Sequence, residues 1–109
     1  MAIEHNTRVR VPAQVRRGEV FAVRCLVMHP MENGRRADAE GRFVPMDLIH
    51  RFVCRYGGQT VFQADMGTGM SANPYLLFHV RATESGVMEF TWLGDDGSVS
   101  TARASIEVT

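Results

Sequence analysis

Short segments in which apolar and polar residues alternate fill most of the chain, and glycine, proline or asparagine stands in nearly every gap between them. Alternation places every second side chain on one face, which is typical of a half-buried β-strand, and helical periodicity is almost absent. The pattern predicts seven strands, at residues 7–11, 19–28, 48–56, 59–65, 75–82, 87–93 and 98–108.

One parity of these strands is apolar and predicts the hydrophobic core. Trp92 is expected at its centre, and Cys25 and Cys54 are expected to point inward from different strands. His50 falls on the inward parity of its strand, so we expect it to be a hydrogen-bonded core residue. The remaining predicted core residues are Val9, Val11, Phe21, Val23, Val27, Leu48, Phe52, Tyr56, Leu76, Phe78, Val80, Met88 and Phe90.

The number and spacing of the strands predict an all-β fold class, an immunoglobulin-like β-sandwich of about seven antiparallel strands, as one domain over residues 1–109. The pair Gly57-Gly58 predicts a two-residue hairpin turn. If successive strands are antiparallel, the segments 29–47, 66–74 and 94–97 lie at one end of the sandwich, where such folds usually bind. The segment 29–47 is predicted to be an exposed excursion, with a small hairpin as one possibility.

Charge and composition narrow the function classes. Twelve basic residues balance twelve acidic ones, and no helix face or tail concentrates the basic residues. On charge grounds, neither nucleic acid nor an anionic membrane is predicted as a partner. The first ten residues lack the apolar run of a signal peptide, and nowhere do eighteen apolar residues stand together. Taken alone, these features predict a cytoplasmic protein without a membrane span.

The sequence offers little catalytic chemistry. It has no GxSxG elbow, and neither cysteine has a base at a telling spacing, so we expect no enzyme activity. The two cysteines are predicted to be buried thiols, with a cross-core disulfide as the alternative. The histidines lack HxH or HExxH spacing, so neither zinc nor a cofactor is predicted. These histidines are His5, His29, His50 and His79.

One cluster favours a different class, a periplasmic copper-binding β-sandwich that uses His29 and Met31. The segment His29-Pro30-Met31 holds a thioether two residues from an imidazole, and Met28, Met66 and Met70 are expected nearby. These ligands suit copper, although methionines more often fill irregular gaps or coat interfaces. The acidic turn 95–97 lacks the spacing of a calcium loop.

Several motifs taken together resemble the SoxZ family of sulfur-oxidation subunits over nearly the whole chain. They are His29-Pro30-Met31-Glu32 with Gly34 and Arg35, then Pro45, Ile49, Phe52, Ser71-Ala72-Asn73-Pro74-Tyr75, Phe90-Thr91-Trp92 and Asp95-Asp96-Gly97-Ser98. The resemblance implies an immunoglobulin-like sandwich that forms a heterodimer with the sulfur carrier SoxY, with a higher oligomer left open. In that family the carrier holds its substrate on a cysteine of a mobile C-terminal arm during thiosulfate oxidation.

The resemblance also implies a role, a compartment and a binding site. The chain is expected to hold SoxY and to help dock the other Sox enzymes in the periplasm, after co-export with a signal-bearing partner. It ends in a strand-like sequence at 105–109 without a Gly-Gly-Cys-Gly-Gly tail, so we do not expect it to carry the substrate itself. The candidate partner-binding residues are His29, Met31, Glu32, Arg35, Ser71, Asn73, Pro74, Tyr75, Asp95 and Asp96.

Overall fold

The structure is a computed structural model that describes residues 7–109, and within that range it contains eight β-strands and no helix. Seven of the strands correspond to the predicted segments, with ends that differ by at most one residue. The strands are β1 (Thr7–Arg10), β2 (Gln14–Val15), β3 (Val20–Val27), β4 (Ile49–Tyr56), β5 (Gln59–Asp65), β6 (Tyr75–Arg81), β7 (Gly86–Gly94) and β8 (Val99–Val108).

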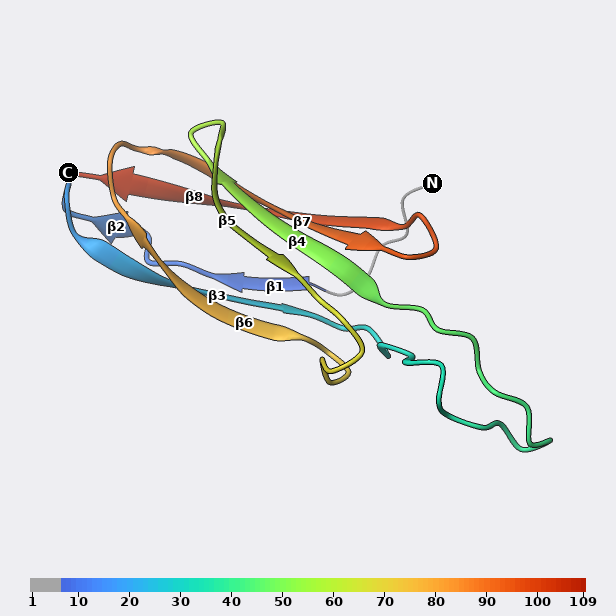
Figure 1. Cartoon of the computed structure of the whole chain (residues 1–109). Coiled ribbons are helices and arrows are strands. Elements are labelled where there is room, and N and C mark those ends of the chain that lie inside the picture. The colour runs from blue at the N-terminus through green and yellow to red at the C-terminus, as the bar shows by residue number, and fades with distance from the viewer. Residues whose placement is uncertain (1–6) are drawn as a thin grey trace.

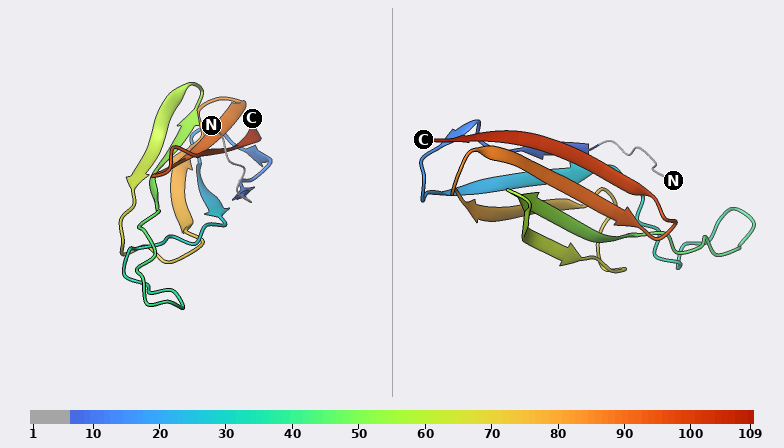
Figure 2. Two further views of the ribbon diagram at one scale, coloured as in Figure 1. Left: turned by 90° about the vertical axis from the view of Figure 1, so that its right-hand side faces the viewer. Right: turned by 90° about the horizontal axis from the view of Figure 1, so that it is seen from above.

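The strands form two sheets that face each other (Figure 1, Figure 2). The three-stranded sheet has the order β1-β3-β6, and the five-stranded sheet has the order β2-β8-β7-β4-β5. All neighbouring strands are antiparallel except β2 and β8, which are parallel. The predicted all-β sandwich is therefore confirmed, and β2 is an eighth strand that the alternation did not reveal.

The strand β2 is only two residues long, too short to show a period. It forms because Gln14 and Val15 pair with Glu107 and Val108 near the end of the chain, and because Val15 is buried there. Such a pairing depends on residues more than ninety positions away. The local sequence, which lies between Pro12 and Gly18, carries no sign of it.

Aromatic rings fill the space between the sheets. Trp92 is 1% exposed and its ring centroid lies 5.1 Å from that of Phe52, which is itself fully buried. Phe78 of β6 stacks on Phe62 of β5 at 4.1 Å between ring centroids. Since β6 and β5 are edge strands of the two sheets, this contact joins the sheets at one edge of the sandwich. The predicted inward parity is confirmed in β3, β6 and β7, where every second residue is buried or partly buried.

His50 is the one predicted core residue that faces the other way. The ladder between β4 and β7 shifts register between Ile49 and Arg51, so Ile49 becomes fully buried and His50 is exposed. A bulge of this kind adds one residue to the strand and reverses the parity before it. The prediction for His50 was wrong because strict alternation was extended through the bulge.

The turn between β4 and β5 has the predicted form. Gly57 and Gly58 have φ angles of 60° and 78°, which are the positive values of a two-residue hairpin turn. The residue before them, Tyr56, is buried and its hydroxyl donates to Glu84 O and accepts from Glu84 N at 3.1 Å. The hairpin is thereby fastened to the segment between β6 and β7.

Candidate functional site

Three loops meet at one end of the sandwich, here called the loop end: residues 28–48, 66–74 and 94–98 (Figure 1). Backbone hydrogen bonds join them directly. Asn73 N donates to His29 O at 2.7 Å, Asp95 N donates to Leu48 O at 2.8 Å, and Met66 N donates to His50 O at 2.8 Å. The prediction that these loops share one end is confirmed.

His29 and Asn73 connect the first two loops through their side chains. His29 N donates to Asn73 Oδ1 at 2.9 Å, while His29 Nδ1 accepts from Met31 N at 2.9 Å. Met31 and Asn73 both adopt positive φ angles, 52° and 55°, a conformation that asparagine tolerates better than most residues. The imidazole of His29 is 4% exposed, so its role here is to shape the loop from inside.

The thioether of Met31 is also used internally. Its Sδ accepts a hydrogen bond from Ile49 N at 3.3 Å, and the residue is 6% exposed. One imidazole nitrogen of His29, Nδ1, and this sulfur therefore already accept backbone N–H groups. Among residues 7–109 no group of three or more His, Cys, Asp or Glu residues is placed to hold a metal ion; His5 lies outside that range.

We expect Asn73→Ala to lower the free energy of unfolding by roughly 1 to 3 kcal/mol, because alanine both strains the positive φ angle and leaves His29 N without its acceptor. Asn73→Gly separates the two effects, since glycine accepts the backbone angle and removes only the hydrogen bond. Urea unfolding of the three proteins measures them. Equal stability of Asn73→Ala and the unchanged chain would show that this connection contributes nothing.

Asp95 and Asp96 hold the third loop. Asp95 Oδ2 accepts from Leu48 N at 3.0 Å, and Asp95 Oδ1 lies 3.1 Å from His50 Nδ1, so the carboxylate spans the bulge at the start of β4. Asp96 Oδ1 accepts from Ser98 N at 2.9 Å. The turn leaves no room at Gly94, where a β-carbon would collide with Ser98 Oγ and Asp96 Oδ1.

The longest loop extends outward from the sandwich as a narrow excursion (Figure 1). Isolated bridges between Glu32 and Asp47 and between Ala37 and Phe43 make it hairpin-like, as one reading of the sequence suggested. Arg36 binds Glu32 with an Nη2–Oε1 distance of 2.7 Å, and this hydrogen bond lowers the pKa of the Glu32 carboxyl. Beyond that pair, Phe43 is 71% exposed, so the excursion presents an apolar side chain to solvent.

The ten predicted partner-binding residues fall into two groups at this end. His29, Met31 and Pro74 are buried, and Asn73, Asp95 and Asp96 accept internal hydrogen bonds although they are exposed. Glu32 is half-buried beside Arg36. Arg35, Ser71 and Tyr75 are exposed. Which of the ten a partner touches stays a prediction, and the three buried residues expose little surface to it.

Both cysteines are free and buried, at 2% exposure for Cys25 and 0% for Cys54. Burial raises the pKa of each thiol to about 12, with a smaller contribution to Cys25 from Cys54. The prediction of buried thiols is confirmed. The thiolate is the reactive form, so neither residue is available for thiol exchange in the folded chain.

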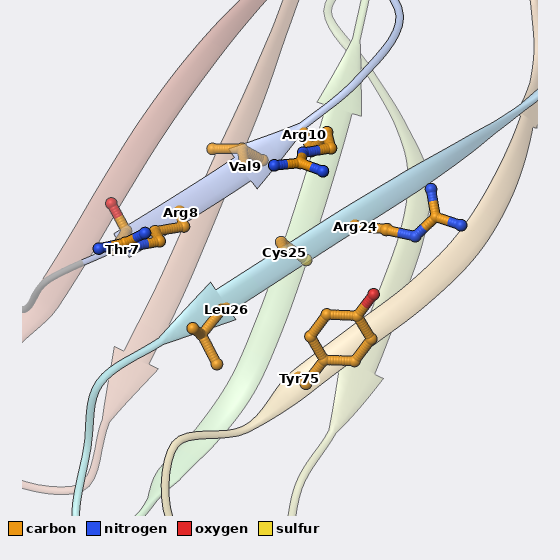
Figure 3. Close-up of a pocket in the computed structure, with 8 residues that line it drawn as sticks. All are labelled: Thr7, Arg8, Val9, Arg10, Arg24, Cys25, Leu26 and Tyr75. Carbon is orange, nitrogen blue, oxygen red and sulfur yellow. The ribbon is translucent and has the colours of Figure 1, made fainter.

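A groove lies on the outer face of the three-stranded sheet and reaches Leu26 and Tyr75, close to the loop end (Figure 3). It has a volume of about 640 Å³, and its floor is the β1 and β3 backbone. Of its lining, only Tyr75 is among the candidate partner-binding residues. The eight lining residues are Thr7, Arg8, Val9, Arg10, Arg24, Cys25, Leu26 and Tyr75. The outward parity of the first two predicted strands, which carries Arg8, Arg10 and Arg24, was the signal that could have revealed it.

The fold and the loop end define an immunoglobulin-like β-sandwich whose loop end is fixed by internal hydrogen bonds and whose two thiols are both buried. The family model described as "Sulphur oxidation protein SoxZ" matches residues 9–105. This chain belongs to the SoxZ family, and it is thus a subunit of a sulfur-oxidation (Sox) system. A comparison with curated protein sequences gives no match.

Several solved structures share the fold. The superoxide reductase (neelaredoxin) of Ignicoccus hospitalis is 19% identical, with 96% of this chain and 81% of that chain covered and a TM-score of 0.70. The sulfur carrier protein SoxY of Chlorobium limicola f. thiosulfatophilum is 12% identical, with 94% and 78% covered and a TM-score of 0.65. A CARDB domain of Pyrococcus furiosus is 12% identical, with 98% of both chains covered and a TM-score of 0.55. At these identities the likeness concerns the fold alone.

The described residues include no helix long and apolar enough to cross a membrane.

Proposed function

We propose that this chain is the non-catalytic subunit of a SoxYZ-type sulfur-carrier complex. In this role it holds a SoxY-type subunit, whose cysteine arm carries the sulfur substrate, and helps to dock the Sox enzymes that act on it. The proposal takes its partner and pathway from the SoxZ family, whose model matches residues 9–105. It also includes the periplasm as the working compartment, reached by co-export with a signal-bearing partner.

The burial of both thiols is the main observation that supports a non-catalytic role for this chain and a carrier role for its partner. The chain has two cysteines, and each is at most 2% exposed with a pKa raised to about 12. A covalent sulfur carrier needs an accessible thiolate to form its persulfide or thiosulfonate. Since no thiol of this chain meets that requirement in the folded state, the carrier cysteine belongs to a partner.

The sandwich suits the complementary task of support. A sulfur-bearing cysteine on a mobile arm must be shielded from stray thiols and still reach several enzymes. A partner fixed in shape can shield one side of such an arm without reacting with it. Two features give this chain that character: the hydrogen bonds that hold its loop end, and an aromatic core that joins the two sheets.

Co-expression with a SoxY-type subunit tests the proposal. Size-exclusion chromatography with light scattering is expected to give a one-to-one complex, and the chain is expected in the periplasmic fraction only when the partner carries an export signal. A chain that stays monomeric beside a folded carrier subunit would refute the proposal. A one-to-one complex whose two chains both stay in the cytoplasm would refute the co-export part alone.

A further inference from the structure

The outer face of the three-stranded sheet concentrates positive charge. Four arginines point outward from it, beside the exposed apolar side chains of Tyr75 and Leu77, and we call the surface that these six residues form the arginine face. Its residues are Arg8, Arg10, Arg24, Tyr75, Leu77 and Arg81. The whole chain has a formal net charge of zero, so this concentration of one sign is a property of the face alone.

Two of the arginines stand directly opposite each other. The ladder between β1 and β3 pairs Arg10 with Arg24, and both side chains are exposed on the same side of the sheet. Like charges in directly opposed positions of an antiparallel pair destabilise the sheet. A position that breaks a local rule in this way is more often retained for a function than for stability.

The described residues provide no counter-charge for this pair. Of the salt bridges found between residues 7 and 109, none involves Arg8, Arg10 or Arg24. On the five-stranded sheet two of the three outward arginines form ion pairs, Arg51 with Asp65 at 2.8 Å and Arg103 with Glu89 at 3.3 Å, and the third, Arg55, donates to Gly58 O at 2.7 Å. The contrast between the two sheets indicates that the missing negative charge comes from another molecule.

The same face presents apolar surface beside the charges. Tyr75 is 54% exposed and Leu77 is 49% exposed, and in the ladder between β3 and β6 they are paired with Leu26 and Arg24. In Figure 3 the Tyr75 ring and the Arg24 side chain lie over neighbouring strands at the border of the groove. Tyrosine and arginine are the residues, with tryptophan, that most often dominate the energy of protein interfaces.

We propose that the arginine face binds an acidic surface of the SoxY-type carrier subunit. Carboxylates of that subunit pair with Arg10 and Arg24, and apolar side chains cover Tyr75 and Leu77. A lasting partner fits the observations better than a visiting enzyme, because the opposed arginines are costly whenever the face is uncovered. This inference rests on the proposed function, since it assigns the surface that its partner occupies.

The double variant Arg10→Thr/Arg24→Thr tests the assignment, because threonine is a good strand residue and removes both charges. The dissociation constant of its complex with the carrier subunit, measured by isothermal titration calorimetry, is expected to rise by about 30-fold or more. Tyr75→Ala is expected to raise it by about 10-fold. The matched control Arg51→Thr/Arg103→Thr removes the same charge from the five-stranded sheet and is expected to change it by less than about threefold.

The stability of the isolated variant gives a second readout. Because the opposed arginines repel each other, Arg10→Thr/Arg24→Thr is expected to melt at the same temperature as the unchanged chain or higher. Weaker binding at undiminished stability identifies a binding surface and excludes a folding defect. A lower melting temperature would contradict the claim that the pair is unfavourable in the free chain.

The outcomes separate this inference from the proposed function. If the unchanged chain does not bind the carrier subunit, both fail. If it binds and the arginine-face variants bind equally well, or no worse than the control, only the inference fails. Binding of a DNA duplex or anionic lipid vesicles through Arg10 and Arg24, with carrier binding unchanged, would overturn it in favour of a different polyanion.

Discussion

Replacing Trp92 by alanine is expected to lower the free energy of unfolding by about 3 to 5 kcal/mol, the usual loss for a large aromatic removed from a core. The side chain is 1% exposed and lies against Phe52, whose ring also lies near Phe78, Phe90 and Phe62. The substitution would leave a cavity where the two sheets meet. Phe52 would lose its nearest aromatic neighbour, so the loss should fall at the upper end if the sheets cannot close over the gap.

Circular dichroism during urea unfolding is the suitable measurement, because Trp92 is the chain's single tryptophan and its removal abolishes the fluorescence signal. Trp92→Phe provides a milder variant in case the alanine variant does not fold. Val87→Ala on the same strand, at a side chain 44% exposed, serves as the control and should change stability by less than about 1 kcal/mol. A loss below about 1 kcal/mol for Trp92→Ala would contradict the central position of this residue.

Raising the pH above 9 is expected to lower the free energy of unfolding, because the two thiols ionise in the unfolded chain and stay protonated in the folded one. In the folded chain the pKa of Cys25 and Cys54 is raised from 9.0 to about 12, mainly by burial, so both remain protonated where an unfolded thiol ionises. The stability that they contribute is complete below pH 9 and is lost as the pH rises from there towards about 12. The loss is about 1.4 kcal/mol for each thiol per pH unit in this window.

Urea unfolding at neutral pH and at about pH 10 measures the effect. Other groups titrate in the same range, so the informative quantity is the difference in slope between the unchanged chain and Cys25→Ala/Cys54→Ala, which should depend less on pH. At about pH 8 a thiol with a pKa of about 12 has roughly a thousandth of the thiolate of an unperturbed one, so labelling of the native chain should be slower by about that factor. Fast labelling of either cysteine in the native state would contradict the burial on which the proposed division of labour depends.

Local alternation predicted the strands well where one face of a strand is apolar and the other is polar. In β3, for example, Phe21, Val23, Cys25 and Val27 are all buried as their parity requires. Alternation gave the wrong side for His50, because a bulge reverses the parity there and no residue in the local sequence indicates a bulge. It also missed β2, because that strand exists only through its pairing with the far end of the chain.

The candidate site was predicted in position but not in detail. Antiparallel succession was enough to bring the three loops to one end. The sequence could not show that His29 and Met31 are used inside the loops, because their partners, Asn73 and Ile49, are 44 and 18 residues away. The arginine face was missed for a related reason. Arg10 and Arg24 become neighbours only when β1 pairs with β3. Charged residues are common on the outward face of a single strand, so neither strand alone indicates a charged surface.

The location of the sulfur during turnover tests the central claim most directly. The complex of this chain with a SoxY-type subunit would be supplied with thiosulfate and the oxidising enzymes, and the intact mass of each chain would be measured by mass spectrometry. We expect the mass of this chain to stay unchanged while the partner gains a sulfur-containing adduct. A thiosulfonate or persulfide adduct on Cys25 or Cys54 would show that this chain takes part in the chemistry that we assign to its partner.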